Sequence, residues 1–144
     1  QLAVHSITRR YRAIAHGNFK EDSFTVEGNI GRHPADRKRM ATNVRNGKPA
    51  VTHVRVLERL RGYSYIECQL ETGRTHQIRV HLSSIGHPIL GDPLYGPKKC
   101  PLPNLEGQVL HAMVLGFLHP RTGEYMEVVA PLPEYFEKLL KLLR

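Results

Sequence analysis

Alternating apolar and polar residues mark several β-strands in the first half of the chain. Over residues 7–16 every second side chain falls on the same face, which is the period typical of a half-buried strand. A further extended segment is expected over residues 24–31, and a short strand over residues 40–44. Residues 51–70 have the pattern of a long β-hairpin that turns at Arg61-Gly62. This hairpin leads directly into the part of the chain where the period changes.

After the hairpin the apolar positions take up a helical period. Ile78, Leu82 and Ile85 recur at i, i+4 and i+7, which predicts a short helix over residues 75–85 with one side against a core. Gly86 is expected to end this helix, because glycine readily adopts the left-handed conformation common at helix ends.

The last third of the chain adds two strands and a second helix. Residues 109–119 are apolar on both faces, which predicts a central, buried strand. Residues 125–130 are expected to pair back onto that strand. A closing amphipathic helix is predicted with Pro133 in its first position and with an ion pair between Glu137 and Lys141.

The order of these elements predicts an α+β fold with a mixed, mostly antiparallel β-sheet and two main helices. The chain has 144 residues, of which 40% are hydrophobic, enough for one domain with a real core. Its formal net charge of +8 favours an anionic partner, and nucleic acid in particular. No run approaches the roughly 18 apolar residues of a membrane-spanning helix.

The cysteines and histidines indicate the cellular compartment and whether a metal site is expected. The chain has two cysteines, which favours a reducing, cytoplasmic compartment because small secreted domains usually contain more. Cys68 occupies a core position on a strand, and Cys100 lies in a loop where it is either a mildly activated thiol or an idle one. The nine histidines have no metal-ligand spacing. We therefore expect no metal site.

Residues 32–39 concentrate positive charge in a segment without apolar periodicity, so a loop is expected. Arg32, Arg37, Lys38 and Arg39 stand against the single negative charge of Asp36. Such a loop suits contact with a phosphate backbone, since each phosphate that is neutralised releases counterions. A solvated basic loop without a ligand is the alternative.

Arg74 lies at the turn before the predicted helix, where unpaired N–H groups and the helix dipole favour an anion. His76, Arg79 and Ser83 fall at i, i+3 and i+7 and share a face turned away from the stripe that contains Ile78. An arginine so close to a helix start suits a carboxylate or a phosphate. Ordinary surface arginines on an amphipathic helix are the alternative.

Tyr11 is surrounded in sequence by Arg9, Arg10 and Arg12. An aromatic ring beside a basic rim suits stacking on an unpaired base. A tyrosine half-buried on a strand, with no contact to a ligand, is the alternative.

Two stretches resemble motifs of the RluA/RluD-like family of RNA pseudouridine synthases. The longer one is Thr-Gly-Arg-Thr-His-Gln-Ile-Arg-Val-His at residues 72–81, continued by residues 86–92 and by Tyr95-Gly96. The other is residues 8–17, which resemble the family's motif around a tyrosine. The similarity runs from about Ile7 to the C-terminus.

The resemblance implies cofactor-free isomerisation of uridine to pseudouridine in RNA, with ribosomal RNA expected first and transfer RNA also open. The family's aspartate nucleophile belongs to a His-Arg-Leu-Asp motif upstream of the tyrosine motif. This chain lacks that motif, and its aspartates are Asp22, Asp36 and Asp92. We therefore expect residues 1–144 to be the C-terminal portion of a catalytic domain, inactive alone. A non-catalytic RNA-binding module on the same scaffold is the alternative.

Individual residues of this chain match residues of the family's motifs by position. Tyr11 matches the tyrosine that contacts the target base, and Arg79 matches the arginine that pairs with the catalytic aspartate. In this chain Arg79 is therefore expected to lack its partner, or to hold water or an anion instead. Arg74, His76 and Gln77 are candidates for holding RNA near the site.

Overall fold

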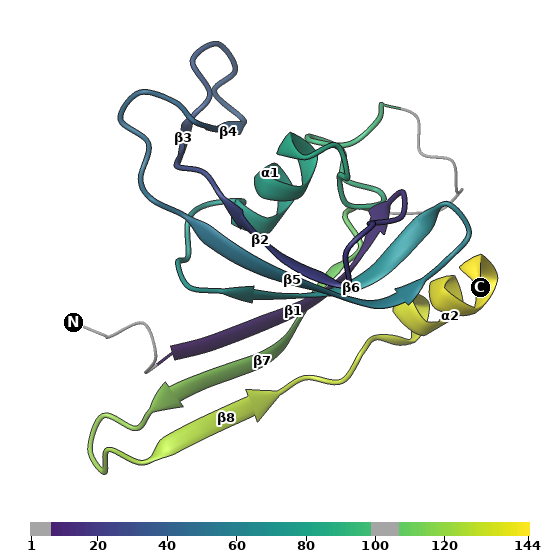
Figure 1. The fold of residues 1–144 in the computed structure, drawn as a ribbon. Helices are drawn as coiled ribbons and strands as arrows, with labels where there is room; N and C mark the ends of the chain where they lie inside the picture. Colours follow the sequence, from purple (N-terminus) through teal and green to yellow (C-terminus); the bar gives the residue numbers. More distant parts are fainter. Residues whose placement is uncertain (1–6, 99–106) are drawn as a thin grey trace.

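The structure is a computed structural model and describes residues 7–98 and 107–144. Cys100 and most of the loop around it lie outside the described residues. Two helices and eight strands make up the described fold (Figure 1). The elements are β1 (Ile7–His16), β2 (Ser23–Glu27), β3 (Ile30–Arg32), β4 (Met40–Thr42), β5 (Val51–Arg59), β6 (Tyr63–Leu70), α1 (Gln77–Ser84), β7 (Leu110–Leu118), β8 (Tyr125–Val129) and α2 (Glu134–Leu143).

Six strands form one sheet in the order β2-β5-β6-β1-β7-β8, and β3 pairs with β4 in a separate ribbon. Every pairing among the described strands is antiparallel. The predicted α+β class with a mostly antiparallel sheet is confirmed. The extended segment expected over residues 24–31 is divided between β2 and β3, because the chain leaves the main sheet between them.

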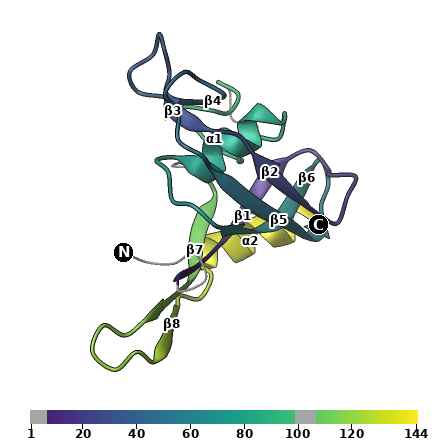
Figure 2. The same ribbon diagram turned by 60° about the vertical axis from the view of Figure 1, so that its left-hand side comes forward.

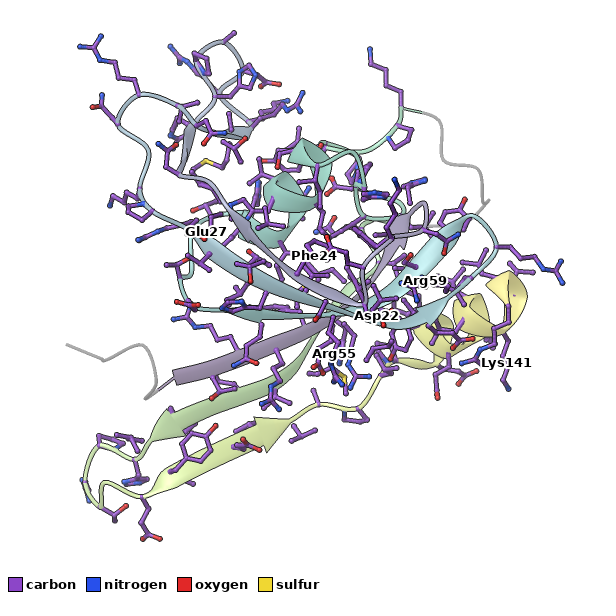
Figure 3. All side chains as sticks on the ribbon, viewed as in Figure 1. Asp22, Phe24, Glu27, Arg55, Arg59 and Lys141 are labelled. Carbon is purple, nitrogen blue, oxygen red and sulfur yellow. The ribbon has the colours of Figure 1, made fainter. Side chains whose placement is uncertain are left out.

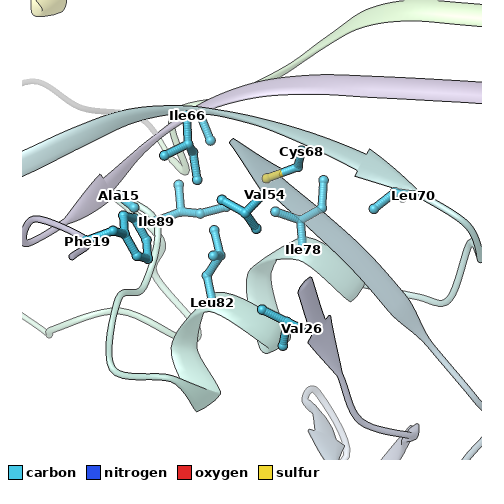
Figure 4. Close-up of a cluster of buried hydrophobic side chains, with 11 residues drawn as sticks. Ala15, Phe19, Val26, Val54, Ile66, Cys68, Leu70, Ile78, Leu82 and Ile89 are labelled. Atoms are coloured by element: carbon cyan, nitrogen blue, oxygen red, sulfur yellow. The ribbon is translucent and has the colours of Figure 1, made fainter. Parts of the chain in front are cut away.

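The alternation along β1 divides the core between two helices. Ala13 and Ala15 face a cluster that includes Ile78 and Leu82 of α1, and Figure 4 shows this cluster between sheet and helix. Ile14 faces the opposite cluster, which is built around Phe136 of α2. All three β1 side chains are fully buried. The C-terminal half of β1 is therefore covered on both faces and provides a rigid base for its N-terminal half.

Helix α1 is shorter than predicted at its N-terminal end. It begins at Gln77, because His76 has a left-handed backbone with φ of 56° and cannot be part of the helix. It ends at Ser84, and Gly86 follows with φ of 85°, as the predicted left-handed stop requires.

Strand β7 contradicts the prediction of a strand buried on both faces. It lies second from the sheet edge, and Leu115 and Leu118 are 47% and 44% exposed. All five residues of the edge strand β8 are exposed, with Val129 at 59%. Figures 1 and 2 show that the β7–β8 hairpin extends beyond both helices, so neither helix packs over its outer part.

Helix α2 differs from the prediction in two details. Pro133 is the N-cap residue, with an extended backbone, rather than the first helical residue. The expected Glu137–Lys141 ion pair is absent among the described residues, and Lys138 pairs with Glu134 at 3.1 Å instead. Within the described ranges, no helix has both the length and the apolar character needed to cross a membrane.

Candidate functional site

Tyr11 lies on β1, opposite Cys68 of β6 and Ala112 of β7. The pairing with β7 shifts register between Arg10 and Tyr11. The tyrosine is half-buried and packs against the core cluster beneath α1. Within the described part of the chain its hydroxyl makes no hydrogen bond. The ring is thus anchored on one side and partly accessible on the other.

The arginines beside Tyr11 point to opposite faces of the sheet. Arg12 turns toward the α2 side, where its guanidinium donates to Glu67 at 3.1 Å and to the Tyr65 hydroxyl at 2.8 Å. Arg9 reaches the turn before α1, since a Cβ placed on Gly73 would lie 2.1 Å from its Nη1. Gly73 therefore makes room for the Arg9 guanidinium, which connects the Tyr11 strand with the turn at residues 73–75.

Arg79 has a partner, so the expectation that it lacks one is wrong. Its Nε and Nη2 donate to the two carboxylate oxygens of Asp92 at 2.8 and 2.9 Å. The arginine side chain is 12% exposed and that of Asp92 is fully buried. Asp92 also accepts hydrogen bonds from the backbone N–H groups of Leu94 and Tyr95. The pair therefore connects α1 with the loop that follows it.

This environment keeps both partners ionised. Burial alone would raise the pKa of Asp92, but the hydrogen bonds from Arg79 and from two backbone N–H groups outweigh burial and lower it. The same contact with Asp92 raises the pKa of Arg79. Arg79 Nη1 makes no hydrogen bond with any described residue, so the guanidinium keeps donors for a second acceptor.

Tyr95 contacts all three residues that were predicted to share a helix face, although only Arg79 and Ser83 belong to α1 and His76 precedes it as the N-cap. The His76 Nδ1 lies 2.8 Å from the Tyr95 hydroxyl, the Arg79 guanidinium lies 5.2 Å from the ring centroid, and Ser83 donates to the Tyr95 carbonyl at 3.0 Å. The backbone N–H of Met40 also donates to the Tyr95 hydroxyl, at 2.8 Å. Tyr95 therefore joins α1 to the β3–β4 ribbon.

One tautomer of His76 fits these contacts best. Burial raises the pKa of Tyr95, so its hydroxyl keeps its proton. We assign the hydroxyl as the donor and His76 Nδ1 as the acceptor, because the hydroxyl oxygen already accepts from the Met40 N–H. Burial and the charge of Arg79 lower the pKa of His76, so the ring is neutral at pH 7. His76 accordingly presents an Nε2–H donor.

Gln77 is buried, with 3% exposure, and its amide is saturated by the protein. Its Nε2 donates to the Val51 carbonyl and the Thr52 hydroxyl, both at 2.9 Å. Its Oε1 accepts from the Thr72 hydroxyl at 2.8 Å and from the Arg74 N–H at 3.0 Å. This burial argues against the direct RNA contact expected of Gln77. The residue instead holds the backbone of Arg74 in place.

His81 was missed as a polar core residue by the sequence reasoning. It is fully buried, with Nε2 at 2.9 Å from the Gly28 carbonyl and Nδ1 at 2.8 Å from the Thr52 hydroxyl. Burial lowers its pKa. A signal did exist, since His81 follows Ile78 by three positions and so lies on the core-facing side of α1.

The basic residues predicted at 32–39 lie on the β3–β4 ribbon, which stands away from the sheet in Figures 1 and 2. Arg32, Arg37 and Lys38 are exposed, and Arg32 Nη1 donates to the Arg37 carbonyl at 3.1 Å. Arg39 is different: its guanidinium lies 5.3 Å from the centroid of the Tyr95 ring, and its Nε is buried without a partner in the described protein.

Comparisons with known proteins point to one family. Residues 1–84 match the family model described as RNA pseudouridylate synthase. The uncharacterized RNA pseudouridine synthase YlyB of Bacillus subtilis is 54% identical over 144 residues, which cover 100% of this chain and 46% of that protein. Ribosomal large subunit pseudouridine synthase D of Neisseria meningitidis is 46% identical over 153 residues, covering 100% of this chain and 41% of its own length.

Solved structures agree with these sequence matches. Human RNA pseudouridylate synthase domain containing 1 has a TM-score of 0.79 and 31% identity, over 91% of this chain and 59% of that chain. Human RNA pseudouridylate synthase domain containing 4 has a TM-score of 0.72 and 27% identity, over 94% and 61%. The chain spans less than half the length of the two bacterial relatives.

Proposed function

We propose that this chain, which belongs to the RNA pseudouridylate synthase family, is part of an enzyme that isomerises uridine to pseudouridine in RNA. The reaction breaks the bond between the ribose and the base nitrogen and rejoins the base through carbon, after the uridine has been flipped out. Ribosomal RNA is the proposed substrate, and the name of the Neisseria relative, ribosomal large subunit pseudouridine synthase D, supports it. The buried free thiol of Cys68 is compatible with the proposed reducing, cytoplasmic location.

One observation carries the proposal for the site. On the α1 side of the sheet, the partly accessible Tyr11 ring lies on the same strand as Arg9, whose guanidinium lies on Gly73, next to Arg74. An aromatic ring with cationic neighbours suits a base together with its phosphate. We assign base contact to Tyr11 and RNA contact to Arg74, to the Nε2–H of His76 and to the ribbon residues Arg32, Arg37, Lys38 and Arg39.

The nucleophile is proposed to come from an aspartate upstream of Gln1 in the longer protein. All three aspartates of the chain have other roles: Asp22 pairs with Arg59 at 3.0 Å, Asp36 accepts from the Lys38 N–H at 3.0 Å, and Asp92 holds Arg79. Because all three aspartates are engaged in these contacts, a second candidate function is a non-catalytic RNA-binding module. The 144 residues alone would then bind RNA without modifying it.

The test uses the longer protein and a transcript of large-subunit ribosomal RNA, with pseudouridine formation as the readout. Tyr11→Ala should lower kcat/KM between about 10-fold and 100-fold, the size expected for one lost base–aromatic contact. Tyr135→Ala on α2, which removes a more exposed tyrosine far from the proposed site in sequence, is the control. If Tyr11→Ala lowered only the melting temperature, the half-buried strand tyrosine would be the better interpretation.

An experiment on Arg79 must separate its proposed role in catalysis from its contact with Asp92. Replacing Arg79 alone would leave a buried carboxylate unpaired, so Arg79→Met combined with Asp92→Asn removes both charges at once. We propose that the double variant folds and binds RNA but forms no pseudouridine, because Arg79 Nη1 would no longer hold the upstream carboxylate. Normal turnover in a folded double variant would contradict this role.

A further inference from the structure

We propose that a cleft between the β3–β4 ribbon and the turn at residues 73–75 binds a phosphate-bearing nucleotide of single-stranded RNA next to the target uridine. The inference rests on the proposed function and adds a subsite to it. Lys48, which the sequence analysis did not single out, is its diagnostic residue.

The cleft has the size and lining of a small-ligand site. Its volume is about 380 Å³, at the lower end of the range usual for such pockets. Arg32, Lys48 and Arg74 supply positive charge from three separate segments, while Ile30 and Met40 contribute apolar surface. A few charged groups above an apolar floor suit a nucleotide, with phosphate on the cations and ribose or base on the floor.

None of the three cations that line this cleft has a carboxylate partner among the described residues. Arg32 donates to the Arg37 carbonyl and Arg74 Nε donates to the Pro49 carbonyl at 2.7 Å, which uses few of their donors. No acidic residue lines the cleft. Elsewhere five arginines are neutralised by carboxylates: Arg12, Arg55, Arg59, Arg79 and Arg144.

Three unneutralised cations around one concavity repel one another, and a bound dianionic or monoanionic phosphate removes that repulsion. The cleft therefore keeps positive charge that a bound phosphate can neutralise. A single phosphate of an RNA backbone is the ligand that matches three converging cations from different segments.

Both walls of the cleft are fixed before any ligand arrives. Lys48 and Ile30 exchange two backbone hydrogen bonds of 2.9 Å, and the Met40 N–H is held by the Tyr95 hydroxyl. The opposite wall is held by Gln77, which accepts from the Arg74 N–H. Preorganised walls reduce the ordering cost of binding.

Gly73 connects the cleft to the Tyr11 strand. It lines the cleft and also lies directly against the Arg9 guanidinium. An RNA strand with its flipped base at Tyr11 would therefore place a neighbouring nucleotide at the cleft, with Arg9 between the two positions.

The experiment measures RNA affinity of the longer protein as a function of salt concentration. Lys48→Gln should weaken binding and reduce the slope of log Kd against log salt by about 0.7 to 1, the contribution of one phosphate contact. Lys48→Arg should restore most of the slope, because charge rather than shape is required. Lys141→Gln is the matched control: it removes the same charge from α2, which Figure 3 shows far from the ribbon.

Lys141→Gln is expected to leave the slope unchanged. If Lys48→Gln had the same small effect as Lys141→Gln in a protein of unchanged melting temperature, the cleft proposal would be overturned. If Lys48→Gln weakened binding and Lys48→Arg failed to restore it, a phosphate contact would also be overturned. Failure of the proposed function looks different, since the wild-type protein would then form no pseudouridine whatever the result at Lys48.

Discussion

Helix α1 and the β7–β8 hairpin are both rich in apolar residues, yet their surroundings differ completely. Around α1, Ile78 and Leu82 are buried in the core and the polar side chains of Gln77 and His81 are saturated by hydrogen bonds. On the hairpin, Val128 is 57% exposed and belongs to a strand without any buried residue.

The comparison shows which region of the fold holds its side chains in defined orientations. The residues that position Arg74 and His76 are held by buried polar contacts with no alternative partner, because an unsatisfied group there would cost free energy. The hairpin is held by its backbone ladder to β1 and by a few exposed side chains. The α1 side is therefore rigid enough to orient a site, whereas the hairpin offers apolar surface.

The largest expected effect is at the buried ion pair of the α1 side. Asp92→Asn should lower the free energy of unfolding by about 3–5 kcal/mol, because it leaves the Arg79 charge unpaired in a mostly buried position. Chemical denaturation would measure the loss. Glu134→Gln, which breaks an exposed pair on α2, should cost no more than about 0.5 kcal/mol. Similar losses in both variants would contradict the assignment of Asp92 as a buried anchor.

The same substitution, valine to alanine, compares the stability contributed by a buried position on the α1 side with that of an exposed position on the hairpin. Val54→Ala, at a side chain with 2% exposure, should cost about 2 kcal/mol through lost burial and a cavity. Val128→Ala, at 57% exposure, should change stability by less than about 0.5 kcal/mol. Melting and denaturation curves of the two variants would measure both losses of stability. An equal loss at Val128 would mean that its side chain is covered in solution.

The pH dependence of stability should report on His81. Its pKa in the folded protein lies below the ordinary value of 6.5, so the unfolded state binds more protons, and stability is lost as the pH falls from about 7 toward 5. One such proton contributes at most about 1.4 kcal/mol per pH unit. His81→Asn should be less stable at pH 8 and should show a flatter pH profile. An unchanged slope would mean that His81 does not contribute.

A smaller effect is expected from the Tyr95 hydroxyl. Tyr95→Phe should cost about 1 kcal/mol, since the Met40 N–H loses its acceptor. Nitrogen-15 NMR of the His76 ring should show Nε2–H in the wild type and a mixture of tautomers in the variant. Tyr125→Phe, which removes an exposed hydroxyl from the hairpin, should leave the His76 spectrum unchanged. A wild-type spectrum with the proton on Nδ1 would contradict the assigned tautomer.

Local patterns predicted much of the fold. The strand over residues 7–16 and the hairpin over residues 51–70 with its turn at Arg61-Gly62 are present as expected, because a period of two depends only on near neighbours. Arg79 and Ser83 share a face of α1 as predicted, whereas His76 precedes the helix. The contact of these residues with Tyr95 was not predicted, because Tyr95 comes from a loop that follows the helix.

The sequence by itself determined the order and type of the elements, the left-handed end of α1 and the family, since periodicity and motifs are properties of consecutive residues. Only the tertiary structure decided which charges are neutralised. Arg79 meets Asp92 because α1 and the loop after it fold together, while Arg32, Lys48 and Arg74 converge with no acid between them. Burial was decided in the same way, because an apolar strand such as β7 is covered only if another element packs over it.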